Sequence, residues 1–137
     1  MKIIGFNFNK ISIERFTDKL EELKINTNVD IKNVKQLKQE LFHTKEEVVE
    51  IIFGYDVDYS PDIAKVYLSG NIILLVDSKT ASEFIKEWKN KKIPEKYKLT
   101  IFNVILKKSN LKSIQLEDEM NLPLHISLPS VKEIKQN

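Results

Sequence analysis

The chain has 137 residues, of which 42% are hydrophobic and 31% charged, so its length and composition suit one globular domain spanning residues 1–137. Cysteine is absent, which excludes a disulfide framework and thiol chemistry. The formal net charge of +2, from 22 basic and 20 acidic residues, excludes a strongly basic or strongly acidic protein.

The first third of the chain predicts two strands. Ile4, Phe6 and Phe8 alternate, while Ile11 and Ile13 continue out of phase, which predicts a strand with a bulge or a turn near Asn9. This opening segment is too short and too polar for a signal peptide or membrane span, so a cytoplasmic protein is expected. Residues 14–23 could make a turn of helix. Residues 23–34 alternate between apolar and polar, which predicts a strand with one solvated face.

Two longer apolar runs follow, at residues 46–60 and 63–76. The stretch "YSPD" between them favours a turn, since Pro61 fixes its own backbone angle, and Gly70 is expected to permit a bend. The inward-facing side chains are expected to be Val49, Ile51, Phe53, Tyr55 and Val57 in the first run and Ala64, Val66, Leu68, Ile72, Leu74 and Val76 in the second. The two runs therefore predict a β-hairpin.

The hydrophobic period becomes helical after Asp77. Residues 78–92 predict a helix capped by Ser78 or Thr80, and residues 94–108 a second helix that begins at Pro94. A third, shorter helical piece is expected around residues 114–120. Strands first and helices afterwards predict an α+β fold: a four-stranded antiparallel sheet followed by two main helices packed on one face.

The final segment, "EMNLPLHISLPSVKEI" at residues 119–134, predicts an extended ribbon because Pro123 and Pro129 disfavour helix. Four apolar side chains then fall on one side of it: Leu122, Leu124, Ile126 and Leu128. Exposing them would forfeit roughly 1.5 to 3 kcal/mol each, so something must cover the ribbon. The cover is the chain's own domain, a second copy or an extended polypeptide.

A second partly apolar surface is expected on the other side of the hairpin. It predicts self-association through Tyr67, Ile73 and Leu75, with Trp88 from the first helix. A homo-oligomer, either a dimer or a dimer of dimers, is therefore expected.

Few residues are arranged for chemistry. Asp56, Asp58 and Asp62 lie near the hairpin turn and could hold a divalent ion, but a solvated hairpin end accounts for them more simply. His43 and His125 have neither a second histidine at metal-binding spacing nor a cysteine to complete a zinc site. With three glycines in the chain there is no glycine-rich phosphate loop. No catalytic residue, metal or cofactor is predicted.

The region between the two helices is rich in lysine. Its lysines are Lys86, Lys89, Lys91, Lys92, Lys96 and Lys98, with Trp88 and Tyr97 among them. Such a patch could bind phosphates and stack bases, but Glu87 and Glu95 dilute its charge. A solvated helix end is favoured, and nucleic acid is not an expected partner.

In the order of its features the chain resembles the SecB-like export-chaperone family, particularly its divergent archaeal-type members. The similarity spans Val48 to Val131, and "MNLPLHISLPSV" stands where that family has a proline-containing apolar stretch after its helices. The resemblance implies a dimer or dimer of dimers that holds unfolded polypeptides in apolar grooves without nucleotide. By position, the groove residues would be Phe53, Tyr55, Leu122, Leu124, Ile126 and Leu128.

One departure limits what the resemblance implies. Bacterial members are strongly acidic and dock on the export motor, whereas this chain is slightly basic, so coupling to that motor is not predicted. The leading hypothesis is a non-enzymatic, ATP-independent holdase for unfolded or precursor polypeptides. The alternatives are an interaction domain, antitoxin-like or adaptor-like, and a small nucleic-acid-binding protein.

Overall fold

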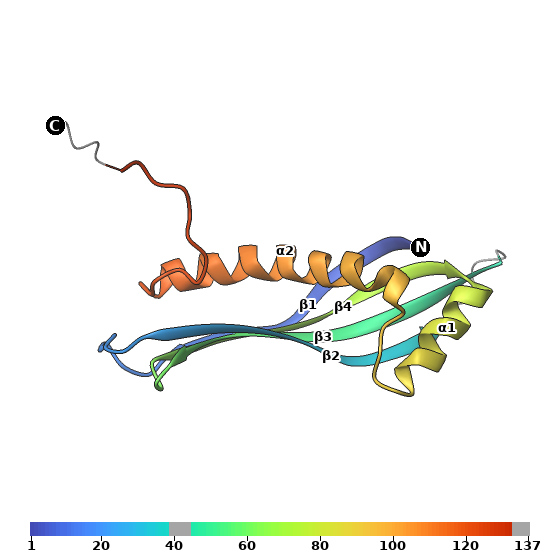
Figure 1. The fold of residues 1–137 in the computed structure, drawn as a ribbon, viewed down its shortest axis with the longest axis horizontal. Helices are drawn as coiled ribbons and strands as arrows, with labels where there is room; N and C mark the ends of the chain where they lie inside the picture. The colour runs from blue at the N-terminus through green and yellow to red at the C-terminus, as the bar shows by residue number, and fades with distance from the viewer. Residues whose placement is uncertain (39–44, 133–137) are drawn as a thin grey trace.

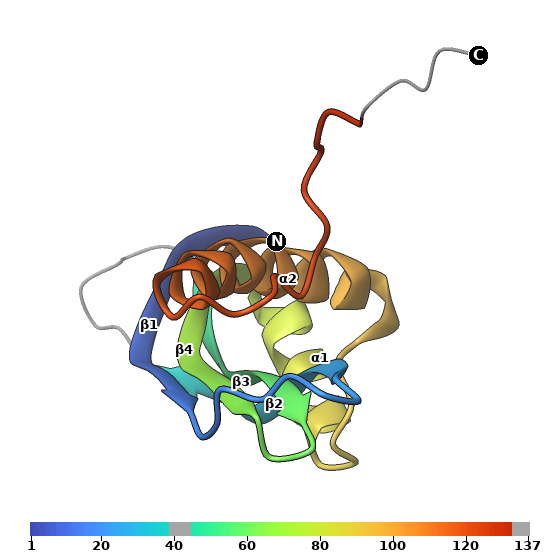
Figure 2. The same ribbon diagram turned by 90° about the vertical axis from the view of Figure 1, so that its left-hand side faces the viewer.

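The computed structural model describes residues 1–38 and 45–132, in which two helices lie over one four-stranded sheet (Figure 1). The elements are β1 (Lys2–Arg15), β2 (Lys24–Leu37), β3 (Glu46–Ser60), β4 (Ala64–Asp77), α1 (Ser78–Trp88) and α2 (Glu95–Glu119). The strand order is β1-β4-β3-β2, and all neighbours are antiparallel. Both helices lie on the same side of the sheet (Figure 2), so the predicted α+β architecture is confirmed. His43 lies outside the described residues.

The core lies between the helices and the two central strands, β3 and β4. Alternate side chains of these strands face the helices and are buried, as their period of two predicts. One buried cluster lies beneath α1 and the first half of α2 and includes Phe53, Ile72, Leu74, Phe84, Ile101 and Ile105. A second lies beneath the rest of α2 and includes Tyr55, Tyr59, Val66, Leu68 and Leu122.

Strand β1 keeps Ile3, Phe6, Phe8 and Ile13 on the core side by means of two bulges. Its pairing with β4 shifts register between Phe8 and Lys10, which confirms the predicted bulge at Asn9, and also between Ile3 and Gly5. The predicted alternation of Ile4 with Phe6 and Phe8 is wrong, because Ile4 is the extra residue of the first bulge and is exposed. Each extra residue restores the phase of the strand after the break. Phe6, Phe8 and Ile13 therefore all pack against the buried clusters.

The helical turn predicted within residues 14–23 is wrong: β1 continues to Arg15, and residues 16–23 form an irregular loop with one turn at residues 21–22. The start of this loop is held by a tertiary hydrogen bond, which the Phe16 amide donates to the Ile63 carbonyl at 2.8 Å. The separate third helix is also wrong. No proline or glycine interrupts residues 95–119, so α2 runs through that whole range as one helix.

The N-terminal cap of α1 differs from the prediction. Asp77, rather than Ser78 or Thr80, accepts a hydrogen bond from the Thr80 amide at 2.7 Å. This bond lowers the pKa of the Asp77 carboxyl. Neither described helix has the length and apolar character that a membrane crossing requires.

Gly70 serves close packing rather than a bend. A Cβ atom at this position would lie 2.0 Å from the carbonyl oxygen of Asn7 in the paired strand β1 and 3.0 Å from the Phe53 ring. Gly70→Ala is therefore expected to lower the free energy of unfolding by about 3 kcal/mol, measured as a shift in the urea midpoint.

Gly54→Ala is the matched control, because its added methyl group would first meet the flexible end of Lys32 at 2.6 Å. The control is expected to unfold within about 1 kcal/mol of the parent, since that side chain can move. Equal midpoints for the two variants would contradict the close approach of β1 to β4.

Candidate polypeptide-binding groove

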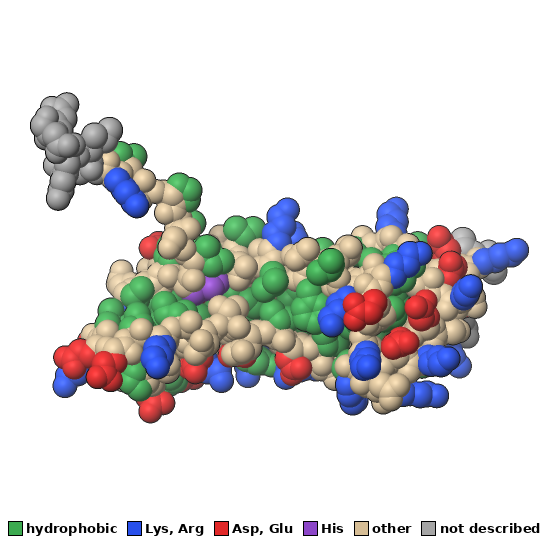
Figure 3. All heavy atoms as spheres, in the orientation of Figure 1, with side chains coloured by type: hydrophobic (Ala, Val, Ile, Leu, Met, Phe, Trp, Pro, Cys, Tyr) green, Lys and Arg blue, Asp and Glu red, His purple; other side chains and the backbone are tan. Residues whose placement is uncertain are grey.

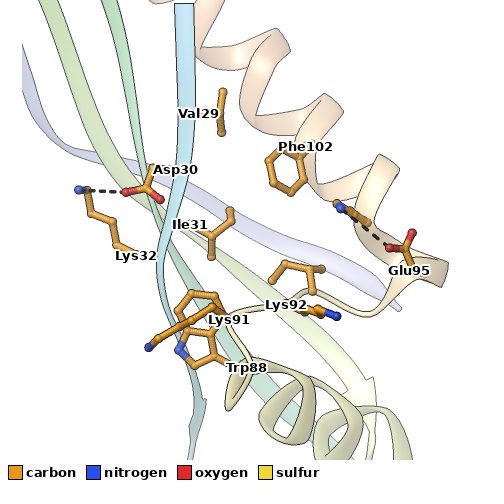
Figure 4. Close-up of a pocket in the computed structure, with 11 residues that line it drawn as sticks. Val29, Asp30, Ile31, Lys32, Trp88, Lys91, Lys92, Glu95 and Phe102 are labelled. Carbon is orange, nitrogen blue, oxygen red and sulfur yellow. Dashed lines mark ion pairs between the residues drawn. The ribbon is translucent and has the colours of Figure 1, made fainter.

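An open groove of about 800 Å³ lies between the edge strand β2 and the start of α2. Val29 and Ile31 form its strand side, Phe102 forms its helix side, and Trp88 lies at one end (Figure 4). Ile93 of the α1–α2 loop also lines it. Val29, Ile31, Trp88 and Phe102 are only half-buried, although they border the core. The groove therefore presents apolar surface from three separate parts of the chain.

The end of the groove is held by the turn that closes α1. Lys91 adopts the left-handed conformation (φ 57°), and the amides of Lys91 and Lys92 donate to the carbonyls of Trp88 and Glu87 at 2.9 and 3.1 Å. These two bonds form a Schellman C-cap, which satisfies the last carbonyls of the helix. These bonds fix the backbone of the turn that follows Trp88 at this end of the groove.

Four charged side chains border this apolar surface, and three of them are lysines: Lys91, Lys92, Glu95 and Lys98. Asp30 and Lys32 belong to the same stretch of β2, but they point to the outer face of the sheet, where the Lys32 ammonium group lies 6.0 Å from the centre of the Tyr67 ring (Figure 4). Lys32 pairs with Asp30 at 3.5 Å, and Lys98 with Glu95 at 3.9 Å (Figure 4). The ammonium group of Lys91 lies 4.7 Å from the centre of the Trp88 ring, a cation–π contact. The rim is therefore basic in sum.

Hydrophobic side chains form a band along the molecular face between α2 and the sheet (Figure 3).

Away from the groove, the C-terminal ribbon is fixed to the end of α2 by another Schellman cap. Asn121 is left-handed (φ 54°), and the Leu122 amide donates to the Glu117 carbonyl at 2.9 Å. Arg15 of β1 donates to the carbonyls of Met120 and Asn121 at 2.9 and 3.1 Å. Leu122 is thereby directed into the second core cluster.

A buried polar network then holds His125. Its Nδ1 lies 2.7 Å from Oε2 of Glu117, and its backbone amide donates to Oε1 at 2.8 Å. Ser113 donates a further hydrogen bond to this carboxylate. On the far side of the ring, Nε2 lies 3.0 Å from both the Tyr55 hydroxyl and Asn110 Oδ1. The Glu117 and His125 side chains are 0% and 2% exposed, so the ribbon is attached through an interior contact.

The surroundings of the network set its ionisation. Burial by itself would raise the pKa of the Glu117 carboxyl, but hydrogen bonds from His125 and Ser113 outweigh it and hold that pKa below the ordinary value. Burial, with the nearby Glu117 charge, raises the pKa of both Tyr55 and Tyr59. Both phenols therefore stay neutral hydrogen-bond donors, and Tyr59 donates to the Pro123 carbonyl at 2.5 Å.

The polypeptide-binding residues predicted from the sequence do not form one surface. Phe53 and Tyr55 are completely buried beneath the helices, and Leu122 is buried beside them. Leu124 is half-buried. The other two lie on the segment that leaves the body of the molecule (Figure 1), where Ile126 is 37% and Leu128 55% exposed. In this arrangement only the ribbon residues after Leu122 are open to a ligand.

The residues predicted for an oligomer interface lie on two different faces. Tyr67, Ile73 and Leu75 are half-buried on the outer side of the sheet, whereas Trp88 lines the groove on the helix side.

Asp56, one of the aspartates considered for a divalent ion, also lies on the outer side of the sheet, where Asn28 donates to it at 3.3 Å. Among the described residues, no three histidine, cysteine, aspartate or glutamate side chains are grouped to hold a metal.

Sequence periodicity does not identify the groove itself. Val29 and Ile31 appear only as the apolar face of a strand, and the packing of the α1–α2 loop decides that they stay half-exposed. Phe102 gives a weak signal, because it lies beside the buried stripe of Ile101 and Ile105 rather than on it. An apolar side chain just off a helical stripe is the feature that could have indicated this wall.

The network predicts how stability depends on pH. Because the folded pKa of Glu117 is lowered, its contribution to stability is complete above about pH 4.5, its ordinary value, and is lost as the pH falls through the folded value. Glu117→Gln is expected to lower the unfolding free energy at pH 7 by about 3 kcal/mol. It is also expected to reduce the loss of unfolding free energy between about pH 4.5 and pH 2. Urea unfolding between pH 2 and pH 7 measures both effects.

Glu119→Gln is the control, since Glu119 lies exposed two residues further along α2. It is expected to have the unfolding free energy of the parent at pH 7 and to lose as much of it as the parent does at acid pH. If Glu117→Gln unfolds like this control, the buried pair does not stabilise the folded chain.

The sequence matches no protein-family model and no curated protein. Among solved structures, the chain is similar to the Mycobacterium tuberculosis Rv1957 SecB-like chaperone in complex with a ChAD peptide from the Rv1956 HigA1 antitoxin. The similarity has a TM-score of 0.51 at 10% sequence identity and covers 98% of this chain and 92% of that chain. At such low identity the match concerns the fold alone. The chain has a SecB-like α+β fold.

Proposed function

We propose that this protein is an ATP-independent holdase that binds exposed hydrophobic segments of unfolded or precursor polypeptides in the groove between β2 and the α1–α2 loop. The observation that carries the proposal is the half-exposed apolar surface of Val29, Ile31, Trp88 and Phe102 along the walls of one groove. Attraction between apolar side chains is non-directional, so such a surface accepts many sequences.

The energetics suit reversible capture. Burying three client side chains contributes roughly 5 to 9 kcal/mol, from which the cost of ordering an extended segment is subtracted. The net affinity is then micromolar or weaker, since about 8 kcal/mol corresponds to 1 μM. Release without nucleotide follows from such an affinity.

Strand β2 adds a backbone contribution. It is an edge of the sheet, so one row of its amide and carbonyl groups has no strand partner within the described chain. An extended client beside Val29 and Ile31 can hydrogen-bond to this row, which requires no particular client sequence. The groove and the edge together suit an unfolded polypeptide better than a compact small molecule.

The proposal includes no enzymatic step and no cofactor. Within residues 1–38 and 45–132, a cluster with the residue types of catalysis is formed by Glu117, His125 and Tyr55, and it is buried at the ribbon anchor, where a substrate has no access. Its hydrogen bonds are directed at the chain's own backbone and side chains, which favours a structural role.

The comparison with solved structures supports the proposal at the level of fold, because the SecB-like neighbour is described with a bound peptide. The assignment to the archaeal-type members, the cytoplasmic location and a role in protein transport remain predictions from the sequence. Coupling to an export motor is not part of the proposal.

Trp88 is the only tryptophan and lines the groove, so it reports on occupancy. A tryptophan-free, extended apolar peptide is expected to shift the emission of Trp88, because it excludes water from the ring. Phe102→Ser is expected to weaken this binding at least about tenfold, as removal of one aromatic contact predicts, and to reduce suppression of client aggregation.

The control is Leu99→Ser, one turn earlier on α2, whose side chain is 76% exposed and does not line the groove. This variant is expected to bind like the parent. Parent-like aggregation suppression by a folded Phe102→Ser protein would show that the groove is not the client site. A pull-down that yields one stoichiometric folded partner, without activity on unfolded clients, would instead favour the interaction-domain hypothesis.

A homo-oligomer, dimer or dimer of dimers, is part of the proposal. Strand β1 is the other edge of the sheet, and Ile4 and Ile11 are exposed along it. An exposed edge with apolar side chains favours pairing with another chain.

Light scattering after size exclusion is therefore expected to give a multiple of the 16.0 kDa chain mass. Ile11→Lys is expected to lower this mass, because it places charge on the exposed edge, while Lys10→Gln leaves it unchanged. If Ile73→Lys lowers the measured molar mass and Ile11→Lys does not, the interface lies on the outer face of the sheet, as predicted from Tyr67, Ile73 and Leu75. A parent protein with the mass of a single chain would refute self-association.

A further inference from the structure

We infer that the groove selects apolar segments flanked by acidic residues and disfavours those flanked by basic residues. The inference rests on the proposed function and adds the charge class of the client. The groove supplies apolar attraction along its length and positive charge at its rim.

The charge comes from two parts of the chain that meet at the groove. Lys91 and Lys92 lie on the loop after α1, and Lys98 lies on the first turn of α2. Lys98 is paired with Glu95. Lys91 and Lys92 are exposed and form no ion pair with any described residue. These two lysines are the available charges.

Other groups near the loop do not cancel this charge. The C-terminal end of α1 contributes the equivalent of about half a negative charge, less than two lysines supply. The rim carboxylate, Glu95, already faces Lys98, and Glu87 at the end of α1 does not line the groove. A carboxylate on a bound segment therefore meets attraction at this end of the groove, and a lysine meets repulsion.

Lys91 is also partly preorganised. Its backbone is fixed by the Schellman cap, and its ammonium group rests over the Trp88 ring at 4.7 Å. Part of the entropy cost of placing a long side chain is thus met before a client arrives. Exposed ion pairs contribute about 0.2 to 1 kcal/mol each, so two of them change affinity several-fold rather than by orders of magnitude.

The test uses three labelled peptides that share one extended apolar core and differ in their flanks: two glutamates, two serines or two lysines at each end. Fluorescence anisotropy measures each affinity in low salt and in 0.5 M NaCl. The glutamate-flanked peptide is expected to bind about fivefold more tightly than the serine-flanked one, and the lysine-flanked peptide about fivefold more weakly. High salt is expected to compress the differences, because it screens exposed charges.

Charge variants locate the effect. The double variant Lys91→Glu, Lys92→Glu is expected to reverse the order of the three peptide affinities. The double variant Lys91→Gln, Lys92→Gln is expected to make the three affinities equal. Lys107→Glu with Lys108→Glu changes the net charge of the chain equally on an exposed part of α2 outside the groove, and is expected to keep the parent order.

The outcomes separate this inference from the function on which it rests. If the serine-flanked peptide does not bind the parent, the polypeptide-binding function itself is wrong. If the serine-flanked peptide instead binds the parent and binds Phe102→Ser more weakly, that result supports the groove as the binding site. If the three peptides then bind equally tightly, or the lysine-flanked peptide binds most tightly, the charge preference is wrong. If the double variant at Lys107 and Lys108 changes the relative affinities of the peptides as much as the one at Lys91 and Lys92, the preference comes from the net charge of the chain. That result would also overturn the inference.

Discussion

The structure depends on one mismatch: two helices cover the centre of a four-stranded sheet but not its edges. The core-side residues of β3 and β4 are buried almost without exception, because both helices lie above them. On the outer strands the cover is incomplete, so Ile11 on β1 and Val29 on β2 keep apolar surface. The groove beside β2 is thus a consequence of how the core is built, and it requires no separate element.

The second half of α2 solves a different packing problem. Its buried positions change from Ile101 and Ile105 to Ser109, Ser113 and Glu117, which are small or polar. Beneath this part of α2 lie Tyr55 and Tyr59, whose hydroxyl groups require partners and donate to Asn110 of α2 and to the Pro123 carbonyl. A polar helix face over tyrosines, with His125 folded back onto Glu117, fixes the ribbon by hydrogen bonds rather than by apolar burial alone.

Much of the fold follows from periodicity, and most of the site does not. Alternation predicts the strands, and the phase change at Asn9 predicts its bulge, because one extra residue inverts the facing of a strand. The cap of α1 does not follow from residue type alone, because Asp77, like the predicted Ser78 and Thr80, has a capping side chain. The Glu117–His125 pair was hidden, since only the turn at Asn121 brings the two together. The groove required knowledge of where the α1–α2 loop packs.

The lysine-rich region shows how the same residues acquire a different meaning in three dimensions. Along the sequence, lysines around Trp88 and Tyr97 suggest a surface for phosphates and bases. In the structure Tyr97 stacks on Phe84 at the core, with ring centres 5.7 Å apart, so it offers no open platform for a base. The groove lysines surround an aliphatic and aromatic surface instead of following a backbone-like track. Charge in such a position adjusts which apolar segments bind, because the apolar contacts supply most of the affinity and the ionic contacts supply the difference between clients.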